Sequence, residues 1–527
     1  MTAAPRTPRP LRAAPVASHG AQTPARRTAR RVQNGAARAA SGVLGLAGER
    51  MTKVDTAWLR MDCASNLMMI VGVWTLKPGV DYESLCQRVE ERLSKYPRFR
   101  QKVVEDAAGA TWVEDRSFDI HHHVVREALP PGADAQQQAA LQGRLAELAM
   151  LPLDRRRPLW QFHLVEDYQG GSAMMVRIHH CIADGIALIA VTMSLVDGGA
   201  APPQPQRRPA AAGLADSFAA SLLRPFTELT VKALGAAGEG AARSLGLLLN
   251  PQEQLHKGLA GSQELGKLAY RVLADAAALL LMPDDARTRL KGKAGPSKRL
   301  AWCEPLPLTE IKAVSKALHC SINDVLLSCV AGAIGAYLQG LGDRVEGQEI
   351  RAMIPVNLRP IDQAYQLGNR FGLVPLVLPI GIVNPVERLY EVRRRMNSLK
   401  GSTQPLLAFA LLAVAGLMIK PAQDALLGMF ARKTTAVVTN VPGPQQKLQL
   451  LGSTLEQTMV WVPQSGDVGL GISILSYGGG VQFGVITDAN LCPEPQQIID
   501  RFAPEFARLS VLTLMLPWGE DQMSLVR

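Results

Sequence analysis

The sequence lacks the cysteine pattern of a disulfide framework or of a structural zinc site. Its seven cysteines are an odd and scattered set without a Cys-x-x-Cys pair: Cys63, Cys86, Cys181, Cys303, Cys320, Cys329 and Cys492. Disulfide scaffolds and structural zinc sites use paired, closely spaced cysteines. The set therefore indicates free thiols in a reducing compartment and argues against zinc.

Long apolar runs are also missing. No run reaches the roughly 18 continuous apolar residues of a membrane span. The nearest, Pro405 to Ile419, is shorter and stops at Lys420. A signal peptide's apolar core is not evident, so we expect no export. The sequence has no Gly-x-Ser-x-Gly elbow, which counts against an α/β-hydrolase.

Acidic residues are scarce at the N-terminus, where residues 1–50 hold nine Arg and only one acid, Glu49. This segment carries +8 of the formal net charge of +11, which leaves +3 for the rest of the chain. A folded part with so little excess charge lacks the basic face that phosphate recognition needs, so we expect no nucleic-acid partner. Residues 1–50 also have few large apolar side chains and are predicted to be a disordered tail. A transit peptide is the alternative.

With 527 residues and 47% hydrophobic content, the chain exceeds what one core usually supports, so two domains are expected. Residues 201–212 are rich in Pro and Ala and are typical of a linker. The Ala/Leu-rich segments 215–249 and 265–282 are predicted to be helices apolar enough to need a lid, a domain partner or a bilayer surface. The predicted boundaries are 1–50 for the tail, 51–200 for the N-terminal domain, 201–297 for the linker and amphipathic helices, and 298–527 for the C-terminal domain.

Local patterns predict several regular elements. Near-continuous apolar runs and turn signals predict strands at 67–76, 161–166, 172–178, 351–355, 373–380, 470–477 and 481–487. Helical spacing predicts helices at 82–95, 135–150, 186–195 and 321–338. The triplet His121-His122-His123 falls in a stretch predicted to be extended, with no carboxylate or cysteine to complete a metal site.

The residues most suggestive of chemistry are His179, His180 and Asp184, followed by Gly185, at a predicted strand-to-helix junction. Neighbouring side chains point in roughly opposite directions, so at most one histidine faces a substrate. We assign that role to His180 and expect Asp184 to fix the local geometry. A neutral imidazole takes a proton from an alcohol near neutral pH, which suggests acyl transfer to a hydroxyl. The alternative is that both histidines belong to the core or bind a metal.

The pattern His-His-x-x-x-Asp-Gly from His179 to Gly185 resembles the motif of the CoA-dependent acyltransferase superfamily, which includes condensation domains of peptide synthetases. Further segments resemble one branch, the bacterial wax ester synthase/diacylglycerol acyltransferase family, and occur in that family's order. They are Pro158-Leu159-Trp160, Asn323-Asp324, Leu367 to Gly372 and Thr439 to Pro444. The resemblance extends from about Met51 to the C-terminus.

The resemblance implies an α/β fold of two similar domains with mixed sheets, of the chloramphenicol acetyltransferase-like or condensation-like type, and a channel between them. It implies transfer of a fatty acyl group from acyl-CoA, a substrate rather than a cofactor, to diacylglycerol or a long-chain alcohol. We expect no cofactor and no metal, and a cytoplasmic protein peripherally associated with the inner membrane face or lipid inclusions. The sequence leaves the oligomeric state open. The alternatives are a condensation-type enzyme that uses carrier-protein thioesters and a non-catalytic lipid-granule binder.

Four further residues are candidates near the site. The resemblance to condensation domains suggests that Arg100 pairs with Asp184, since a buried carboxylate needs a partner, and a solvated basic stretch is the alternative. Asn323 at a helix start is a candidate to polarise the acyl carbonyl, and a structural role is its alternative. Asp324 lies at capping-box spacing from Ser321, so a cap is its alternative. Trp160 has a family counterpart near the active-site motif, and its alternative is a packing role.

Overall fold

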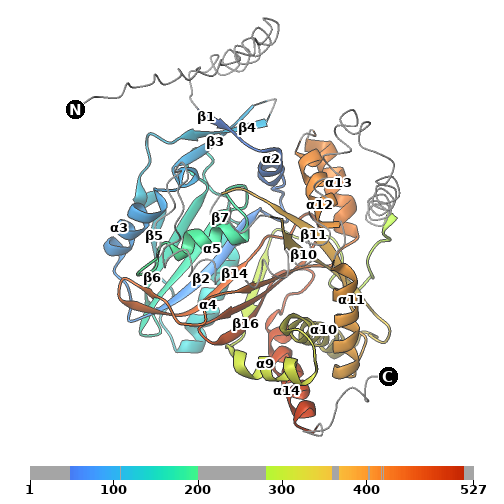
Figure 1. The fold of residues 1–527 in the computed structure, drawn as a ribbon. Helices are drawn as coiled ribbons and strands as arrows, with labels where there is room; N and C mark the ends of the chain where they lie inside the picture. The colour runs from blue at the N-terminus through green and yellow to red at the C-terminus, as the bar shows by residue number, and fades with distance from the viewer. Residues whose placement is uncertain are drawn as a thin grey trace, which may run out of the picture. The chain divides into compact units, whose positions relative to one another are not determined.

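A computed structural model of the protein describes residues 48–106, 109–199, 281–358, 367–400, 404–416, 418 and 420–515. The predicted tail up to residue 47 and most of the predicted linker, residues 200–280, lie outside the described residues. The chain divides into two units, Met1–Glu49 and Arg50–Arg527. A short strand, β1 (Gly48–Arg50), spans their boundary. The second unit contains both large β-sheets and the helices that cover them (Figure 1).

The first large sheet is built around two buried antiparallel strands, β2 (Met69–Lys77) and β7 (Gly171–His179). Both form where apolar runs predicted strands, because a strand covered on both faces has no polar side to show. The full order is β13 (Gln449–Leu450), β14 (Ser453–Trp461), β2, β7, β6 (Trp160–Tyr168) and β5 (Val124–Glu127). His179 is the last residue of β7 and pairs with Met69, so the histidine motif begins at the end of a central strand.

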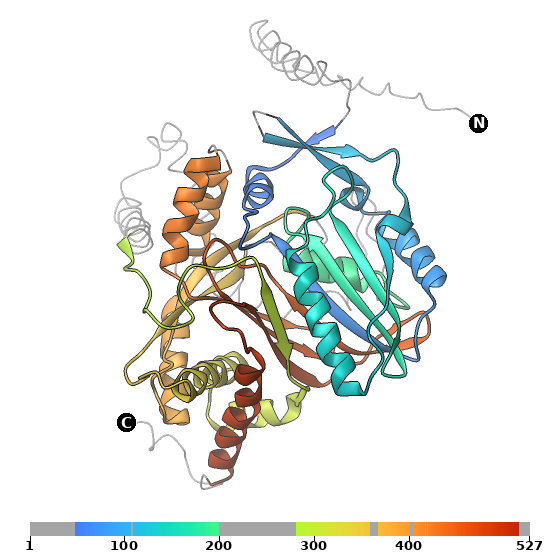
Figure 2. The same ribbon diagram turned by 180° about the vertical axis from the view of Figure 1, so that it is seen from behind.

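Helices cover both faces of this sheet. The helices described in this part of the chain are α2 (Lys53–Arg60), α3 (Tyr82–Leu93), α4 (Asp134–Met150) and α5 (Gly185–Met193). The views from the front and from behind show α5 on one face and α4 on the other (Figures 1 and 2). The sequence predicted the last three of these helices. A hairpin of β3 (Gln101–Asp106) and β4 (Gly109–Glu114) follows a 3₁₀ turn, η1 (Pro97–Phe99).

The second large sheet is mixed. Its order is β11 (Phe371–Leu378), β10 (Ile350–Asn357), β12 (Ala436–Pro442), β15 (Leu470–Tyr477), β16 (Gly480–Asp488) and β8 (Lys298–Trp302), with β9 (Leu306–Pro307) also paired to β16. The β10–β12 and β12–β15 pairs are parallel, and the other pairs are antiparallel. Gly478 and Gly479, at φ 57° and 84°, form a hairpin turn between β15 and β16, the strands predicted at 470–477 and 481–487.

The helices of this half surround α10 (Ile322–Gly340), which packs against α9, α11 and α14. Their bounds are α9 (Leu308–Ala317), α11 (Pro385–Leu399), α12 (Gln404–Ala415), α13 (Lys420–Arg432) and α14 (Gln496–Leu514). Among the described helices, α10 has the length and apolar composition of a membrane span, but most of it is buried in the protein. A helix that is apolar on every side is expected at such a core position.

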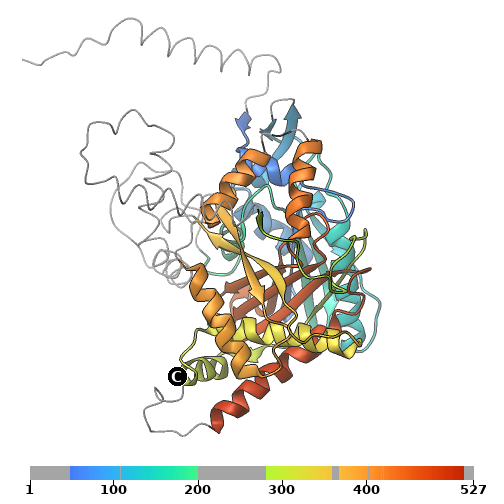
Figure 3. The same ribbon diagram turned by 90° about the vertical axis from the view of Figure 1, so that its right-hand side faces the viewer.

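Sheet pairing crosses the predicted division of the chain into 51–200 and 298–527. Strand β14 comes from the C-terminal part of the chain but pairs with β2 and belongs to the first sheet. One hydrophobic core unites side chains of both parts, among them Trp58, Phe371 and Trp461. Helix α12 packs against α2 and β11, as the view from the side also shows (Figure 3). The two parts therefore stabilise each other.

The predicted extended conformation of His121–His123 was wrong. Residues Ile120–His122 form a 3₁₀ turn, η2, and the strand β5 begins only at Val124. Asp119 causes the turn, since its carboxylate accepts the backbone N–H of His121 at 3.0 Å. Short polar side chains stabilise such turns in preference to a strand.

Candidate active site

The histidine motif occupies the loop between β7 and α5. Asp184 is the N-cap of α5, and its Oδ1 accepts the backbone N–H of Ala187 at 3.0 Å. Its Oδ2 accepts the N–H of Arg370, from the segment that leads into β11, also at 3.0 Å. The residue is 4% exposed. Asp184 therefore holds the loop to the other part of the chain, which agrees with a geometric role for this carboxylate.

His180 lies in an aromatic environment and is 3% exposed. Its ring stacks on Trp58 with centroids 4.2 Å apart and an interplanar angle of 12°. Phe371 lies on another side, 5.5 Å away. Burial lowers the pKa of His180 to about 4, although its own carbonyl, Asp184 and Asn369 act in the opposite direction. The imidazole is therefore neutral near pH 7, the form that a general base requires.

His179 points to a different set of groups. Its Nε2 lies 3.3 Å from Oδ1 of Asp62, and its Nδ1 accepts the backbone N–H of Cys181 at 3.2 Å. Because both ring nitrogens contact protein groups, His179 is engaged in structure, while Nδ1 of His180 has no hydrogen-bond partner in the described part of the chain.

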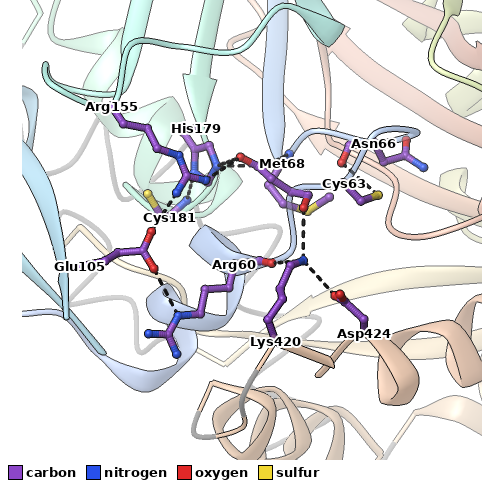
Figure 4. Close-up of polar contacts among 11 residues, drawn as sticks. Arg60, Cys63, Asn66, Met68, Glu105, Arg155, His179, Cys181, Lys420 and Asp424 are labelled. Atoms are coloured by element: carbon purple, nitrogen blue, oxygen red, sulfur yellow. Dashed lines mark hydrogen bonds and ion pairs between the residues drawn. The ribbon is translucent and has the colours of Figure 1, made fainter. Parts of the chain in front are cut away.

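Asp62 connects His179 to a chain of charged side chains. It accepts the backbone N–H of Met68 at 2.7 Å and lies 3.3 Å from Arg155. Arg155 also forms an ion pair with Glu105, and Glu105 forms another with Arg60, as Figure 4 shows. Lys420 of α13 donates to the carbonyl of Arg60 and pairs with Asp424 in the same view. This network fixes the outer side of the His179 ring.

Trp160, a predicted near-site residue, is a core residue. It is 1% exposed, stacks on His123 with centroids 4.3 Å apart, and donates its indole N–H to the carbonyl of Phe99 at 2.9 Å. In the sheet it pairs with Ile178, just before the histidine motif. The geometry therefore favours the packing alternative, with Trp160 supporting the strand end that carries the motif.

The two asparagine-containing motifs meet in space. The Asn440 side chain, on β12, donates to Oδ1 of Asn323 at 2.7 Å, and Asn323 lies in the first turn of α10. Asp324 completes a capping box, because its carboxylate accepts the N–H of Ser321 at 2.8 Å and Ser321 accepts its N–H in return. This geometry gives Asp324 the capping role. Asn323 binds Asn440 through the oxygen of its carboxamide, which leaves its amide hydrogens for another acceptor.

The expected pairing of Arg100 with Asp184 requires a correction. Arg100 lies 3.4 Å from Glu114 and stacks on Phe118. Arg98 is the inward-facing arginine, since the 3₁₀ turn at Pro97 buries its side chain and leaves Arg100 at the turn's end. Its Nη1 donates to the carbonyl of Ile182, in the motif loop, at 2.9 Å. The sequence offered three nearby cations and no local signal to choose among them.

A buried carboxylate, Asp55, was missed as a site residue. It is 0% exposed and accepts the backbone N–H of Asn369 at 3.0 Å, the Asn369 Nδ2 at 2.8 Å and Arg98 at 3.3 Å. Asn369 Nδ2 also donates to the carbonyl of His180 at 2.8 Å. Gly368 makes this approach possible, because at φ 112° a Cβ there would lie 3.3 Å from Arg98. The polar Asn369 in the Gly368-to-Gly372 motif was the available signal.

Comparison with family models decides the identity. The model of the wax ester synthase/diacylglycerol acyltransferase catalytic domain matches residues 51–326, and that of the WS/DGAT C-terminal domain matches residues 367–510. The chain belongs to the wax ester synthase/diacylglycerol acyltransferase family. This confirms the resemblance inferred from the motifs and makes the protein an acyltransferase. Among the described residues, no group of three or more His, Cys, Asp or Glu is placed to hold a metal ion.

Individual relatives agree with the family assignment. A putative diacylglycerol O-acyltransferase of Mycobacterium bovis is 27% identical over 474 residues, which cover 88% of this chain and 96% of the relative. A probable diacylglycerol O-acyltransferase of Mycobacterium tuberculosis has the same identity and coverage. The wax ester synthase/diacylglycerol acyltransferase from Marinobacter aquaeolei VT8 superposes with a TM-score of 0.60 at 20% identity, covering 89% of this chain and all of that one.

The predicted fold class is confirmed as well. The first condensation domain of the CDA synthetase has a TM-score of 0.53 at 16% identity, covering 88% of this chain and 96% of that domain. Together with the Marinobacter structure, it shows the two-part α/β fold with mixed sheets that the motif predicted. At these identities the likeness concerns the fold alone.

Proposed function

We propose that this acyltransferase moves a fatty acyl group from acyl-CoA to diacylglycerol, with long-chain alcohols as further acceptors. The observation that carries the proposal is the buried, neutral imidazole of His180, which stacks on Trp58 and lies within an intact His-His-x-x-x-Asp-Gly motif. The named activity of the mycobacterial relatives supports diacylglycerol as the acceptor. The surrounding Trp58 and Phe371 give the apolar surface that a lipid acceptor needs.

The reaction proceeds by direct transfer. His180 takes the proton of the acceptor hydroxyl, and the oxygen attacks the thioester carbonyl. The C–S bond then breaks as the tetrahedral intermediate collapses, and the imidazolium protonates the CoA thiolate. The ester and free CoA are the products, and His180 returns to its neutral form. No protein nucleophile and no acyl-enzyme are required.

Substrate tests distinguish this proposal from its alternatives. Purified protein is given labelled palmitoyl-CoA with diacylglycerol and with hexadecanol in parallel, and the products are separated. We expect triacylglycerol, with wax ester from the alcohol. Transfer from a carrier-protein thioester but not from CoA would favour a condensation-type enzyme. Binding of lipid without turnover would favour a non-catalytic lipid-granule protein, against which the intact His180 and Asp184 argue.

His180 and His179 give the sharpest mutational test. His180→Ala is expected to lower kcat by about 10² to 10⁴, the range for loss of a general base. His179→Ala is expected to cost less in kcat and more in stability, because it leaves the buried Cys181 N–H without its acceptor and removes one partner of the partly buried Asp62. Steady-state kinetics and circular dichroism of both variants check this. If His179→Ala proved more damaging to kcat with both variants folded, the assignment would be reversed.

We also propose that the protein is cytoplasmic and associates peripherally with the inner membrane face or with lipid inclusions. All seven cysteines are free, which suits a reducing compartment. The end of α14 exposes Val511, Leu514 and Met515, a small apolar surface of the kind that binds lipid. Cell fractionation checks the proposal, and recovery of all protein in the soluble fraction of lipid-storing cells would contradict it.

A further inference from the structure

The carboxamide of Asn369 has only one possible orientation. Its Nδ2 donates both hydrogens, one to Oδ1 of Asp55 at 2.8 Å and one to the carbonyl of His180 at 2.8 Å. A flipped amide would place its oxygen against two acceptors, which is unfavourable in a buried site. Asn369 is 5% exposed, so water does not compensate for such a flip. Oδ1 therefore faces away from Asp55.

Two complementary atoms of these joined residues lack partners. Oδ1 of Asn369 and Nδ1 of His180 are both buried and make no hydrogen bond within the described part of the chain. They belong to residues already joined by the bond from Asn369 Nδ2 to the His180 carbonyl. One atom is an acceptor, and the other is a donor in one of the two neutral tautomers. Buried polar atoms are rarely left unpaired, so an unpaired acceptor beside a histidine suggests a role for it.

We propose that Asn369 is a positioning residue that accepts the Nδ1 proton of His180 and thereby selects the tautomer in which Nε2 is the base. Asp55 holds the carboxamide in the orientation this requires, and Arg98 compensates the charge of Asp55 at 3.3 Å. The motif from Gly368 to Gly372 thus supplies the group that orients the catalytic histidine. The inference rests on the proposed function, since it concerns the base of that reaction.

The charges around His180 agree with this arrangement. Burial lowers the pKa of His180, and the groups that raise it include its own carbonyl, Asp184 and the Asn369 side chain, while His179 lowers it. The His180 carbonyl and the Asn369 oxygen are thus the neutral acceptors beside the ring, and of the two only the Asn369 oxygen has no donor. Asp55 from α2 and Arg98 from the 3₁₀ turn are the other charged groups at this side.

A structural clamp without influence on the tautomer is the competing explanation. Asp55, Arg98 and Asn369 join α2, the η1 turn and the start of β11 to two carbonyls of the motif loop. Their loss therefore lowers stability in either case. The decisive readouts are the tautomer of His180 and the pH dependence of kcat, because a clamp alone moves neither one in a folded variant.

The experiment compares full-length wild type with Asn369→Ala, Asn369→Asp and a matched control, Asn384→Ala. Asn384 caps α11 and accepts the N–H groups of Val386 and Glu387, so its loss destabilises the fold far from the motif loop. The protein carries ¹⁵N-labelled histidine, and the His180 signals are identified by their absence in His180→Ala. Kinetics use palmitoyl-CoA and diacylglycerol dispersed in detergent.

We expect wild type and Asn384→Ala to show His180 protonated at Nδ1 and not at Nε2. Asn369→Ala is expected to lower kcat about 10- to 100-fold with little change in KM, and to mix the two tautomers. Asn369→Asp keeps an acceptor beside Nδ1 and adds a negative charge, so it is expected to move the acidic limb of the kcat profile to higher pH and to retain more activity than the alanine variant.

Two results would overturn the inference. One is an Nε2–H tautomer in the wild type, and the other is an Asn369→Ala protein that is folded with unchanged tautomer and kcat profile. If Asn369→Ala does not fold, the wild-type tautomer and the pH profile of kcat for Asn369→Asp still distinguish the inference from a purely structural role. The proposed function is judged separately, because retention of turnover by His180→Ala would refute the role of His180 whatever Asn369 does.

Discussion

The aromatic contacts of His180 explain how the imidazole is held among apolar groups and protected from water. Trp58 and Phe371 cover the imidazole, and the two aromatic rings lie 5.6 Å apart. Stacking restricts the rotation of the ring, and burial keeps it neutral by penalising the charged form. The histidine thus enters the reaction already in the required form, and the charge that develops on it lasts only while the intermediate exists.

Stability is expected to depend on pH through His180. A histidine whose pKa falls from about 6.5 in the unfolded chain to about 4 in the folded protein contributes its full stability above pH 6.5 and loses it as the pH falls toward 4. The loss is on the order of 3 kcal/mol for this one group. Denaturant unfolding of wild type and His180→Phe from about pH 7 down to about pH 4, a range that runs from above the first of these pKa values to the second, measures it.

Two other buried histidines provide an internal control for this prediction. Burial also lowers the pKa of His123 and His163 to about 4, so the variant is expected to keep a reduced slope rather than none. A slope equal to that of the wild type would show that His180 is protonated in the folded protein without cost. It would also contradict the neutral base on which the mechanism depends.

Asp184→Asn tests the geometric role of the motif's acid. Each carboxylate oxygen accepts a backbone N–H, from Ala187 and Arg370. Asparagine accepts with one oxygen and turns an amide group toward the other donor, which costs about 1–3 kcal/mol in a buried site. We therefore expect lower thermal stability together with a lower rate. A variant with unchanged melting temperature and no activity would indicate a direct chemical role instead.

At the level of elements, the sequence predicted what depends on local pattern. The strand β7, the turn with the histidines and the helix α5 were expected because an apolar run, a polar turn and a second apolar run follow one another. The capping box of α10 was visible for the same reason. Strand β14 in the first sheet was not predictable, since its partner β2 lies far away in the sequence.

The sequence did not reveal the contacts that hold the motif loop for a similar reason. Asp55 and Asn369 are 314 positions apart, and only the folded chain brings them together. The error between Arg98 and Arg100 is more local, because a single 3₁₀ turn at Pro97 decides which of them faces inward. Hydrophobic periodicity carries no information on such a turn.

The close contact between α12 and β11 makes a prediction for Gly372. A Cβ at this position would lie 1.8 Å from the carbonyl oxygen of Pro405, so Gly372→Ala requires α12 to move away from the strand. We expect a loss of about 1–3 kcal/mol in unfolding free energy, as for other overpacked sites, and reduced activity through the neighbouring Phe371. Chemical denaturation and the acyltransferase assay measure both effects.

Gly428→Ala is the matched control. Gly428 lies within α13, and nothing is within 4 Å of a Cβ built there. Alanine in a helix interior is favourable by roughly 0.5–1 kcal/mol, so this variant is expected to be as stable as wild type or slightly more so. If the two variants behaved alike, the contact with Pro405 would not determine the position of α12.

At the scale of the whole molecule, the active site exists only where the two parts of the chain meet. The motif loop follows a strand of the first sheet, yet the His180 carbonyl and the Asp184 carboxylate are held by Asn369 and Arg370 from the second part. Strand β14 and a common hydrophobic core join the same two parts. A change that loosens one part is therefore expected to alter the geometry of His180 as well as stability.

The N-terminal segment is where the charge of the molecule is concentrated. Residues 1–50 carry +8, whereas the family match begins at residue 51. Basic residues near an anionic membrane contribute about 1 kcal/mol each, and salt weakens this attraction. Residue 51 itself is packed in the folded part, because Met51 is 4% exposed and donates its N–H to the carbonyl of Ala110 at 2.9 Å.

A protein that begins at Met51 is therefore expected to fold and to keep its turnover on detergent-dispersed acceptor. It loses the pair between Arg50 and Asp106, which is half exposed and worth little. Its binding to anionic vesicles is expected to fall at low salt and to change little at high salt, as a sedimentation assay with both proteins measures. Neutral vesicles are the control, since they offer no charge to the tail. If the protein that begins at Met51 were insoluble or inactive in detergent, residues before Met51 would have to pack in the folded part. Detergent contains no membrane, so a loss of membrane binding could not explain that result.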